Sequence, residues 1–454
     1  MSKKGIIGHD TATEQPRPRK SIAKVLISSV FILLILGSLL HPKSPRYCRP
    51  RPKSIEDRVS AILSETPLID GHNDLAILLR GLYNNHIYDK NFTEPFTKGG
   101  MAYHVDIPRL REGKNGGAFW SVYTPCPAEG LNFSDENYAA SVQLTLQQID
   151  LMERLRAAYP DSFSGIVDSE SAKAAFKQGK LISPLGIEGL HQIGNSVANL
   201  RRFYALGVRY ATLTHNCGNQ FADAALWEHP FQKAPSYWGG VSRKGRELIN
   251  EMNRIGMIVD LSHVSVDTML DVLGGFEEEW PGSKAPVMFS HSSAYALCPH
   301  PRNVPDHVLQ LVKQRNSIVM VNFSPDFISC VDNGNRNGVP DPYPANNTLS
   351  QVADHITYIG NLIGYDHVGL GSDFDGIQST PEGLEDVSKY PDLIAELLRR
   401  GVSDADAAKV AGGNILRVWA DVEQVAAKMQ SRGEPVMEDD LPNLWGSEAL
   451  KFDL

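Results

Sequence analysis

The sequence predicts an α/β protein folded as a closed (β/α)8 barrel of the TIM type. Short apolar runs alternate with amphipathic helical stretches, and continuous apolar strands between helices are typical of a parallel sheet buried on both faces. Eight such units suit a closed barrel. An open doubly wound sheet is the alternative, but no Gly-x-Gly-x-x-Gly follows the first run. In order, the runs are PLIDGHND, GAFWSVYTP, ISPLGIEG, VRYATLTHN, MIVDLSHV, PVMFSHS, SIVMVNFS and HVGLGSDFDG.

The helical stretches between the runs carry start and stop signals. In SRKGRELINEMNRIG, Ser242 can cap the first turn and Gly256 can adopt the left-handed conformation at the end. Residues 390–430 predict two further helices after the eighth run, and a polar, proline-containing stretch follows them. We therefore place the barrel at residues 54–425 and a C-terminal surface extension at residues 426–454.

The N-terminal region has the composition of a membrane anchor. The stretch VLISSVFILLILGSLL follows several basic residues and, at about 1.5 Å per residue, extends for about 24 Å. We expect a cytoplasmic tail at residues 1–20, a signal anchor at 21–40 and a Pro/Arg-rich stalk at 41–53. A cleaved signal peptide is the alternative, although no small-residue cleavage site follows the apolar stretch.

This organisation predicts a single-pass type II membrane protein with its catalytic domain extracellular or lumenal. Sequons at Asn91, Asn132 and Asn346 fit glycosylation on that side, whereas the sequon at Asn322 lies in an apolar run where a glycan would not fit. A net charge of -9 gives no support for nucleic-acid binding.

Polar residues follow most of the runs, at the strand ends where a barrel has its active site. His72 and Asp74 lie two positions apart and share one face of the first strand. One histidine at a strand end is usually structural, but several on separate strands with carboxylates indicate a metal centre. The other residues at these ends are Glu188, His215, His263, His291, Asp373 and Asp375.

Imidazole and carboxylate ligands suit zinc, and one carboxylate can bridge two ions about 3.5–4 Å apart. We expect His72 and Asp74 on one ion, His263 and His291 on the other, and Glu188 between them.

Taken together, these residues resemble the membrane dipeptidases, zinc metallopeptidases of the amidohydrolase-like barrel group. The resemblance extends over about residues 60–420 and rests on LIDGHNDL, GIEGLHQIG, RYATLTHNC, IVDLSHVS, FSHSSAYALC, RNVPD, SDFDG and EGLEDVSKYPDLIAELLRR. It implies dipeptide substrates, two Zn²⁺ ions per subunit and hydrolysis of the peptide bond by a hydroxide that bridges the ions.

The resemblance also assigns roles to individual residues. The implied metal ligands are His72, Asp74, Glu188, His263 and His291. The implied catalytic residues are Glu188, His215, which stabilises the oxyanion, and Asp373, which handles the proton; His215, Arg302 and Asp373 bind substrate, with Arg302 on its carboxylate. From the sequence alone, Arg302 could instead form an exposed ion pair, and we expect Asp375 to be an outer-sphere or turn residue.

The cysteines are also interpreted by resemblance, which implies disulfides between Cys126 and Cys217 and between Cys298 and Cys330. Cys48 in the stalk is left over, so we expect a homodimer linked through it. The chain ends in SEALKFDL rather than an apolar tail, so no C-terminal lipid anchor is expected. The insertion NGNRNGVPDPYPANN, residues 333–347, is interpreted as a tolerated surface loop, with a reshaped pocket rim as the alternative.

Two other functions remain compatible with the pattern. One is a different binuclear barrel hydrolase, such as a deaminase, a lactonase or a phosphotriesterase, although these more often carry a first-strand His-x-His and a lysine bridge. The other is a non-catalytic ectodomain, which loss of metal ligands would indicate. Every ligand position that the resemblance implies is occupied by a residue able to bind metal.

Overall fold

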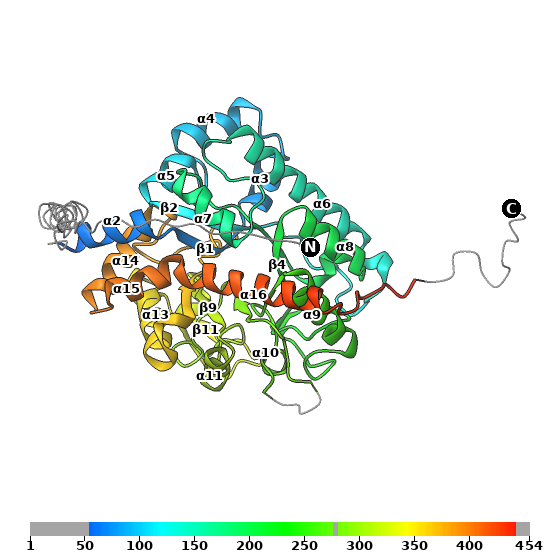
Figure 1. Ribbon diagram of the computed structural model, residues 1–454. Coiled ribbons are helices and arrows are strands. Elements are labelled where there is room, and N and C mark those ends of the chain that lie inside the picture. The colour runs from blue at the N-terminus through cyan, green and yellow to red at the C-terminus, as the bar shows by residue number, and fades with distance from the viewer. Residues whose placement is uncertain (1–53, 276–279, 442–454) are drawn as a thin grey trace, which may run out of the picture. The chain divides into compact units, whose positions relative to one another are not determined.

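Eight parallel strands close into a barrel in the computed structural model, which describes residues 54–275 and 280–441 (Figure 1). The strands are β1 Leu68–Asn73, β2 Asn115–Ser121, β3 Leu185–Glu188, β4 Val208–Thr212, β7 Ile258–Asp260, β8 Met288–Phe289, β9 Ile318–Val321 and β12 Val368–Leu370. Around the barrel their order is β1-β12-β9-β8-β7-β4-β3-β2, and the pairing of Asp70 with Leu370 closes it. The predicted barrel is therefore confirmed, with each of its strands inside one of the eight apolar runs or overlapping it.

Helices connect the strands and surround them. They are α2 Ile55–Glu65, α3 Leu75–Tyr83, α4 Lys90–Lys98, α5 Ile107–Glu112, α6 Asp135–Ala158, α7 Ser169–Lys177, α8 Val197–Ala205, α9 Arg243–Ile255, α10 Val266–Leu273, α11 Asp306–Gln314, α12 Pro325–Ile328, α13 Leu349–Ile363, α14 Tyr390–Arg399, α15 Asp404–Ala408 and α16 Asn414–Ser431. In α9 the side chain of Ser242 accepts a hydrogen bond from the Gly245 backbone, and Gly256 ends the helix with φ 88°. Both predicted signals thus act as expected.

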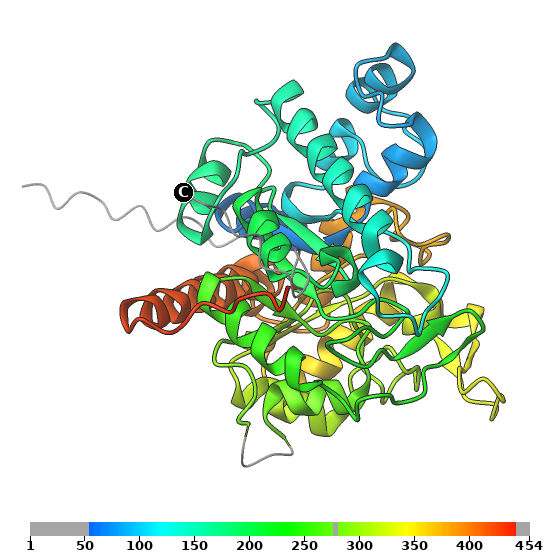
Figure 2. The same cartoon turned by 90° about the vertical axis from the view of Figure 1, so that its right-hand side faces the viewer.

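The last helix covers one end of the barrel. Trp419 of α16 packs in one buried cluster with Ile69, Phe119 and Met320 of the strands, and its ring centroid lies 5.5 Å from that of Phe119. Figure 1 shows α16 lying across the strands, and Figure 2 shows it after a 90° turn about the vertical axis. The boundary predicted at residue 425 falls inside this helix, which continues to Ser431. The chain beyond it remains attached, because Asp439 accepts hydrogen bonds from the first backbone amides of α8.

Two small hairpins stand outside the barrel. The first, β5 Leu226–Glu228 with β6 Phe231–Lys233, belongs to the long connection after β4; the second pairs β10 Cys330–Val331 with β11 Asp341–Pro342. They touch: the Lys233 amide donates to the Asn337 carbonyl at 2.7 Å, and Val339 packs on Leu226. The insertion at 333–347 therefore braces the first hairpin, which favours the reshaped-rim interpretation over a merely tolerated loop.

Two disulfides brace the connections after the strands. Cys126 is bonded to Cys217 and Cys298 to Cys330, as the resemblance implied. The sequon residues Asn91, Asn132 and Asn346 are exposed, whereas Asn322 is buried.

The predicted tail, signal anchor and stalk, including Cys48, lie outside the described residues. None of the helices within residues 54–275 and 280–441 combines the length and the apolar character that a membrane span requires.

Candidate active site

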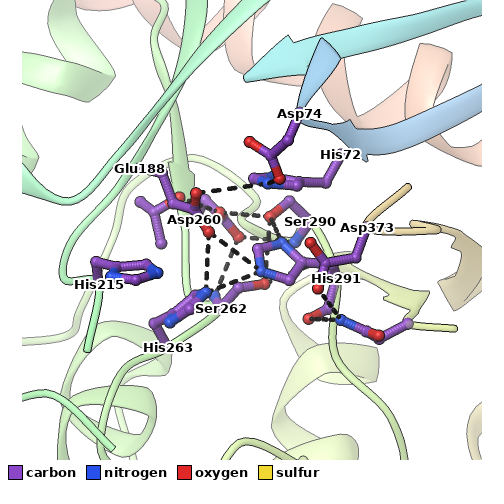
Figure 3. Close-up of polar contacts among 12 residues, drawn as sticks. His72, Asp74, Glu188, His215, Asp260, Ser262, His263, Ser290, His291 and Asp373 are labelled. Carbon is purple, nitrogen blue, oxygen red and sulfur yellow. Dashed lines mark hydrogen bonds and ion pairs between the residues drawn. The ribbon is translucent and has the colours of Figure 1, made fainter. Parts of the chain in front are cut away.

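Five side chains that the sequence predicts as metal ligands converge at one end of the barrel (Figure 3). Nε2 of His72 lies 3.0 Å from Oδ2 of Asp74 and 3.5 Å from Oε2 of Glu188. The other oxygen of Glu188, Oε1, lies 2.9 Å from Nε2 of His263 and 3.4 Å from Nε2 of His291. Each carboxylate oxygen of Glu188 therefore faces a different group of ligands, which is the arrangement a bridging carboxylate needs.

Each histidine among these ligands has a polar partner at its Nδ1 atom. The Nδ1 atom of His72 lies 2.7 Å from the Tyr210 hydroxyl, that of His263 lies 2.9 Å from Oδ1 of Asn216, and that of His291 lies 2.8 Å from Oγ of Ser290. With Nδ1 occupied in this way, Nε2 is free to face the centre with its lone pair, as in metal sites whose ligands are oriented by outer partners.

The Ser290 hydroxyl is itself fixed by a buried carboxylate. It donates to Oδ2 of Asp260 at 2.6 Å, and the Thr212 hydroxyl donates to the same oxygen at 2.5 Å. Asp260 therefore orients His291 through Ser290. Sequence reasoning missed this residue, although an aspartate within the otherwise apolar run MIVDLSHV was a signal that could have found it.

Three residues of this region have a strained backbone conformation. The φ values of His263, Asp373 and Asp375 are 66°, 65° and 67°. They lie in the left-handed region, which residues other than glycine rarely adopt. Such conformations persist where the surroundings over-determine them, most often at functional sites. At Asp375 the surroundings are visible: its amide donates to Nδ1 of His104 at 2.9 Å, and its Oδ1 accepts from the His104 amide at 2.9 Å. Asp375 therefore contacts His104 by two hydrogen bonds, and its role as an outer-sphere or turn residue stays a prediction.

His215 and Asp373 lie on opposite sides of the ligand cluster in Figure 3. The ring centroid of His215 is 4.3 Å from that of His263, and Oδ2 of Asp373 accepts a hydrogen bond from the Asn322 amide at 3.0 Å. Both residues, together with Arg302 and Tyr123, line a cavity of about 570 Å³ over the centre. The predicted catalytic and substrate-binding residues are therefore brought together.

Arg302 is buried, with 3% of its surface exposed, so it is not the exposed ion pair that was the alternative interpretation. Its guanidinium lies 4.8 Å from the ring centroid of Phe327, and its Nε and one terminal nitrogen have no hydrogen-bond partner. Burial lowers the pKa of Arg302 to about 10, so the group remains a cation at neutral pH. A buried cation with free donors beside a cavity is suited to binding a carboxylate.

The electrostatics of the centre favour a bound cation. Burial lowers the pKa values of His215, His263 and His291 well below the usual range, which leaves neutral imidazoles able to act as ligands. Burial also lowers the pKa of His72, but the carboxylates of Asp74 and Glu188 outweigh it and raise that pKa to about 10. Oδ1 of Asp74 is buried without a hydrogen-bond partner. Convergent lone pairs, an unpartnered carboxylate oxygen and desolvated acids fit divalent metal ions.

The barrel and this ligand set define a class: metal-dependent hydrolases with the active site at one end of a (β/α)8 barrel. Residues 56–433 match the family model described as membrane dipeptidase, peptidase family M19. The chain belongs to this family, and it is a metallodipeptidase.

Individual relatives agree with the family assignment. The chain is 45% identical over 435 residues to dipeptidase aclJ of Aspergillus oryzae, covering 94% of this chain and 96% of that protein. It is 46% identical over 376 residues to dipeptidase tcpJ of Claviceps purpurea, covering 83% and 81%. Among solved structures, dipeptidase AC, a metallopeptidase of family M19, is 26% identical with a TM-score of 0.65, covering 79% and 99% of the two chains.

A metallopeptidase from Rhodobacter sphaeroides, solved with a phosphinate mimic of L-Ala-D-Ala, is 24% identical with a TM-score of 0.64, covering 79% of this chain and 99% of that one. At this identity the likeness shows a shared fold.

Tyr210→Phe is expected to weaken metal binding about 10- to 100-fold, the usual effect of removing an outer partner of a ligating histidine. Without the phenol oxygen, Nδ1 of His72 loses its acceptor and the imidazole its orientation. Competition with a zinc chelator measures the affinity. Tyr138→Phe is the matched control, because the Tyr138 hydroxyl is buried without a hydrogen-bond partner. Equal affinities in the two variants would contradict the role given to Tyr210.

Proposed function

We propose that this metallodipeptidase uses two zinc ions, with His72 and Asp74 on one, His263 and His291 on the other, and Glu188 shared. The observation that carries the proposal is the placement of the two Glu188 oxygens, 3.5 Å from Nε2 of His72 and 2.9 Å from Nε2 of His263. A pair of divalent ions supplies an activated water and a Lewis acid for a peptide carbonyl.

The remaining residues of the cavity bind and orient the substrate. Arg302 holds the C-terminal carboxylate of the dipeptide through its unpartnered nitrogens, which predicts a requirement for a free carboxyl group. His215 lies beside the cluster with a neutral imidazole and donates a hydrogen bond to the oxygen that becomes negative.

Asp373 accepts the proton of the attacking water and returns it to the leaving amine. Its Oδ2 is fixed by Asn322, and burial raises its pKa to about 6, so near neutral pH it is ionised yet close to the point of proton transfer. Its place across the cluster from His215 supports a division in which the acid–base and oxyanion functions act from different sides of the bound peptide bond.

The test of this function uses the purified full chain, analysed for metal and assayed on simple dipeptides. We expect two zinc ions per chain, hydrolysis of an unmodified dipeptide, and loss of activity on chelation that zinc restores. A deaminase, lactonase or phosphotriesterase would bind the ions but leave dipeptides intact. A chain with bound zinc and no dipeptide hydrolysis would thus contradict the proposal.

We also propose that the chain is a type II membrane protein anchored by residues 21–40, with the barrel extracellular or lumenal and a homodimer linked through Cys48. The exposed sequon residues Asn91, Asn132 and Asn346 and the two disulfides support an oxidising compartment. On a non-reducing gel, wild type is expected to run as a dimer and Cys48→Ser as a monomer. Unchanged mobility of Cys48→Ser would rule out the link. The orientation is tested by treating the natural membrane-bound protein with a glycosidase, and a gel mobility that does not change on treatment would contradict it.

A further inference from the structure

A second cavity of about 380 Å³ opens beside the active-site cavity and shares Asn216 and Glu228 with it. Glu228 ends the first strand of the hairpin after β4, and its carboxylate lies 3.4 Å from Nδ1 of His215. The two cavities therefore adjoin each other at Glu228. We call the second one the side compartment.

The barrel order places the side compartment across the active site from Arg302. Its disulfide wall joins Cys126, in the connection after β2, to Cys217, in the connection after β4, so the compartment lies over β2, β3 and β4. Arg302 follows β8 and stacks on Phe327, which follows β9. Since β8 and β9 are three and four strands away from β3 in the eight-stranded order, Arg302 and the compartment belong to connections on different sides of the barrel.

This geometry fixes which part of a dipeptide reaches the compartment. With the substrate carboxylate on Arg302 and the scissile carbonyl at the ligand cluster, the amino-terminal residue extends toward Glu228. This orientation rests on the proposed function. The side chain of the amino-terminal residue is then the group that can enter the side compartment.

The walls of the compartment combine apolar surface with negative charge. Leu131 and Trp227 supply apolar surface, Glu129 and Glu228 supply carboxylates, and none of its lining residues is a lysine or an arginine. The Glu228 carboxylate lies 3.4 Å from Nδ1 of His215 and accepts a hydrogen bond from the Asn216 side-chain amide at 3.5 Å, and His229 also lines the compartment. The second carboxylate, Glu129, accepts from the Asn132 amide at 2.9 Å.

We propose that the side compartment is a specificity site for a long cationic side chain, lysine or arginine, on the amino-terminal residue of the substrate. The aliphatic stem packs along Leu131 and Trp227, whose indole face also attracts a cation. The charged end reaches the carboxylates of Glu228 and Glu129. A half-buried carboxylate that forms no ion pair with a lysine or an arginine of the described residues gains most from a cation brought by a ligand.

The test compares Lys-Ala with norleucyl-Ala, which keeps a linear aliphatic stem but lacks the ammonium group. Wild type, produced without N-linked glycans because Asn132 lines the compartment, is expected to show a kcat/KM about tenfold higher for Lys-Ala, the size of one charge-assisted hydrogen bond. In Glu228→Gln/Glu129→Gln the ratio is expected to fall close to one.

Using the ratio removes any effect of Glu228 on His215, because such an effect changes both substrates equally. Asp326→Asn is the matched control: Asp326 lines the active-site cavity but not the side compartment, so its loss should leave the ratio unchanged. A wild-type ratio at or below one, or a double variant that retains the wild-type ratio, would overturn this inference. In either case, hydrolysis of norleucyl-Ala would still support the proposed function. Absence of hydrolysis of both substrates would overturn both.

Discussion

Glu188→Gln is expected to lower dipeptidase activity by more than about hundredfold, since loss of even an outer partner of a metal ligand typically costs 10- to 100-fold. Glu188 faces His72 with one oxygen and His263 and His291 with the other, so a neutral amide removes the shared negative charge from both ion positions at once. We expect zinc content to fall below two per chain, measured by elemental analysis of the purified variant.

The control for this substitution is Glu251→Gln. Glu251 is also a buried glutamate, 1% exposed. Its carboxylate accepts hydrogen bonds from Arg254 and Arg201 and is not among the predicted metal ligands. Its loss should lower the melting temperature without changing zinc content or kcat. If Glu188→Gln retained two zinc ions and wild-type turnover, the bridging role would be wrong.

The barrel and the ligand set could be predicted because their signals are local. An apolar run that ends in a histidine or an acid specifies both a buried strand and a polar group at its end, as His72 lies near the end of β1 and His291 follows β8. Closure of the barrel then brings these ends together whatever the conformation of the connections. The end of the barrel at which the ligands gather thus follows from the strand order.

The support around the centre could not be predicted, because it depends on contacts between residues far apart in the chain. Tyr210 contacts His72 and His104 contacts Asp375 through pairs separated by more than a hundred positions. Glu228 reaches the cavity only because the connection after β4 folds back as a hairpin, which the insertion at 333–347 braces. Such placements depend on the three-dimensional path of the long connections and leave no periodic signal in the sequence.

Arg302→Met is expected to reduce kcat/KM for a dipeptide by about 30- to 1000-fold, the effect of removing about 2–4 kcal/mol of charge-paired binding. The loss should appear mainly in KM, because the carboxylate is bound in the ground state and in the transition state alike. A dipeptide amide, which lacks the carboxylate, should be a poor substrate of wild type and should lose little more in the variant. Comparing the two substrates therefore isolates the contact between guanidinium and carboxylate.

Arg156→Met provides a matched control, because Arg156 is also buried, has unpartnered guanidinium nitrogens, and has its pKa lowered by burial to about 10. It lies in α6 and does not line the active-site cavity, so the preference for dipeptide over amide should be unchanged. Neither Arg302 nor Arg156 forms an ion pair with a carboxylate of the described residues. Neither substitution should therefore cause the large loss of stability that follows from breaking a buried ion pair. If Arg302→Met lowered activity equally on the dipeptide and on its amide, Arg302 would act on the geometry of the centre, through the nearby Asp373 and Glu188, rather than on the substrate.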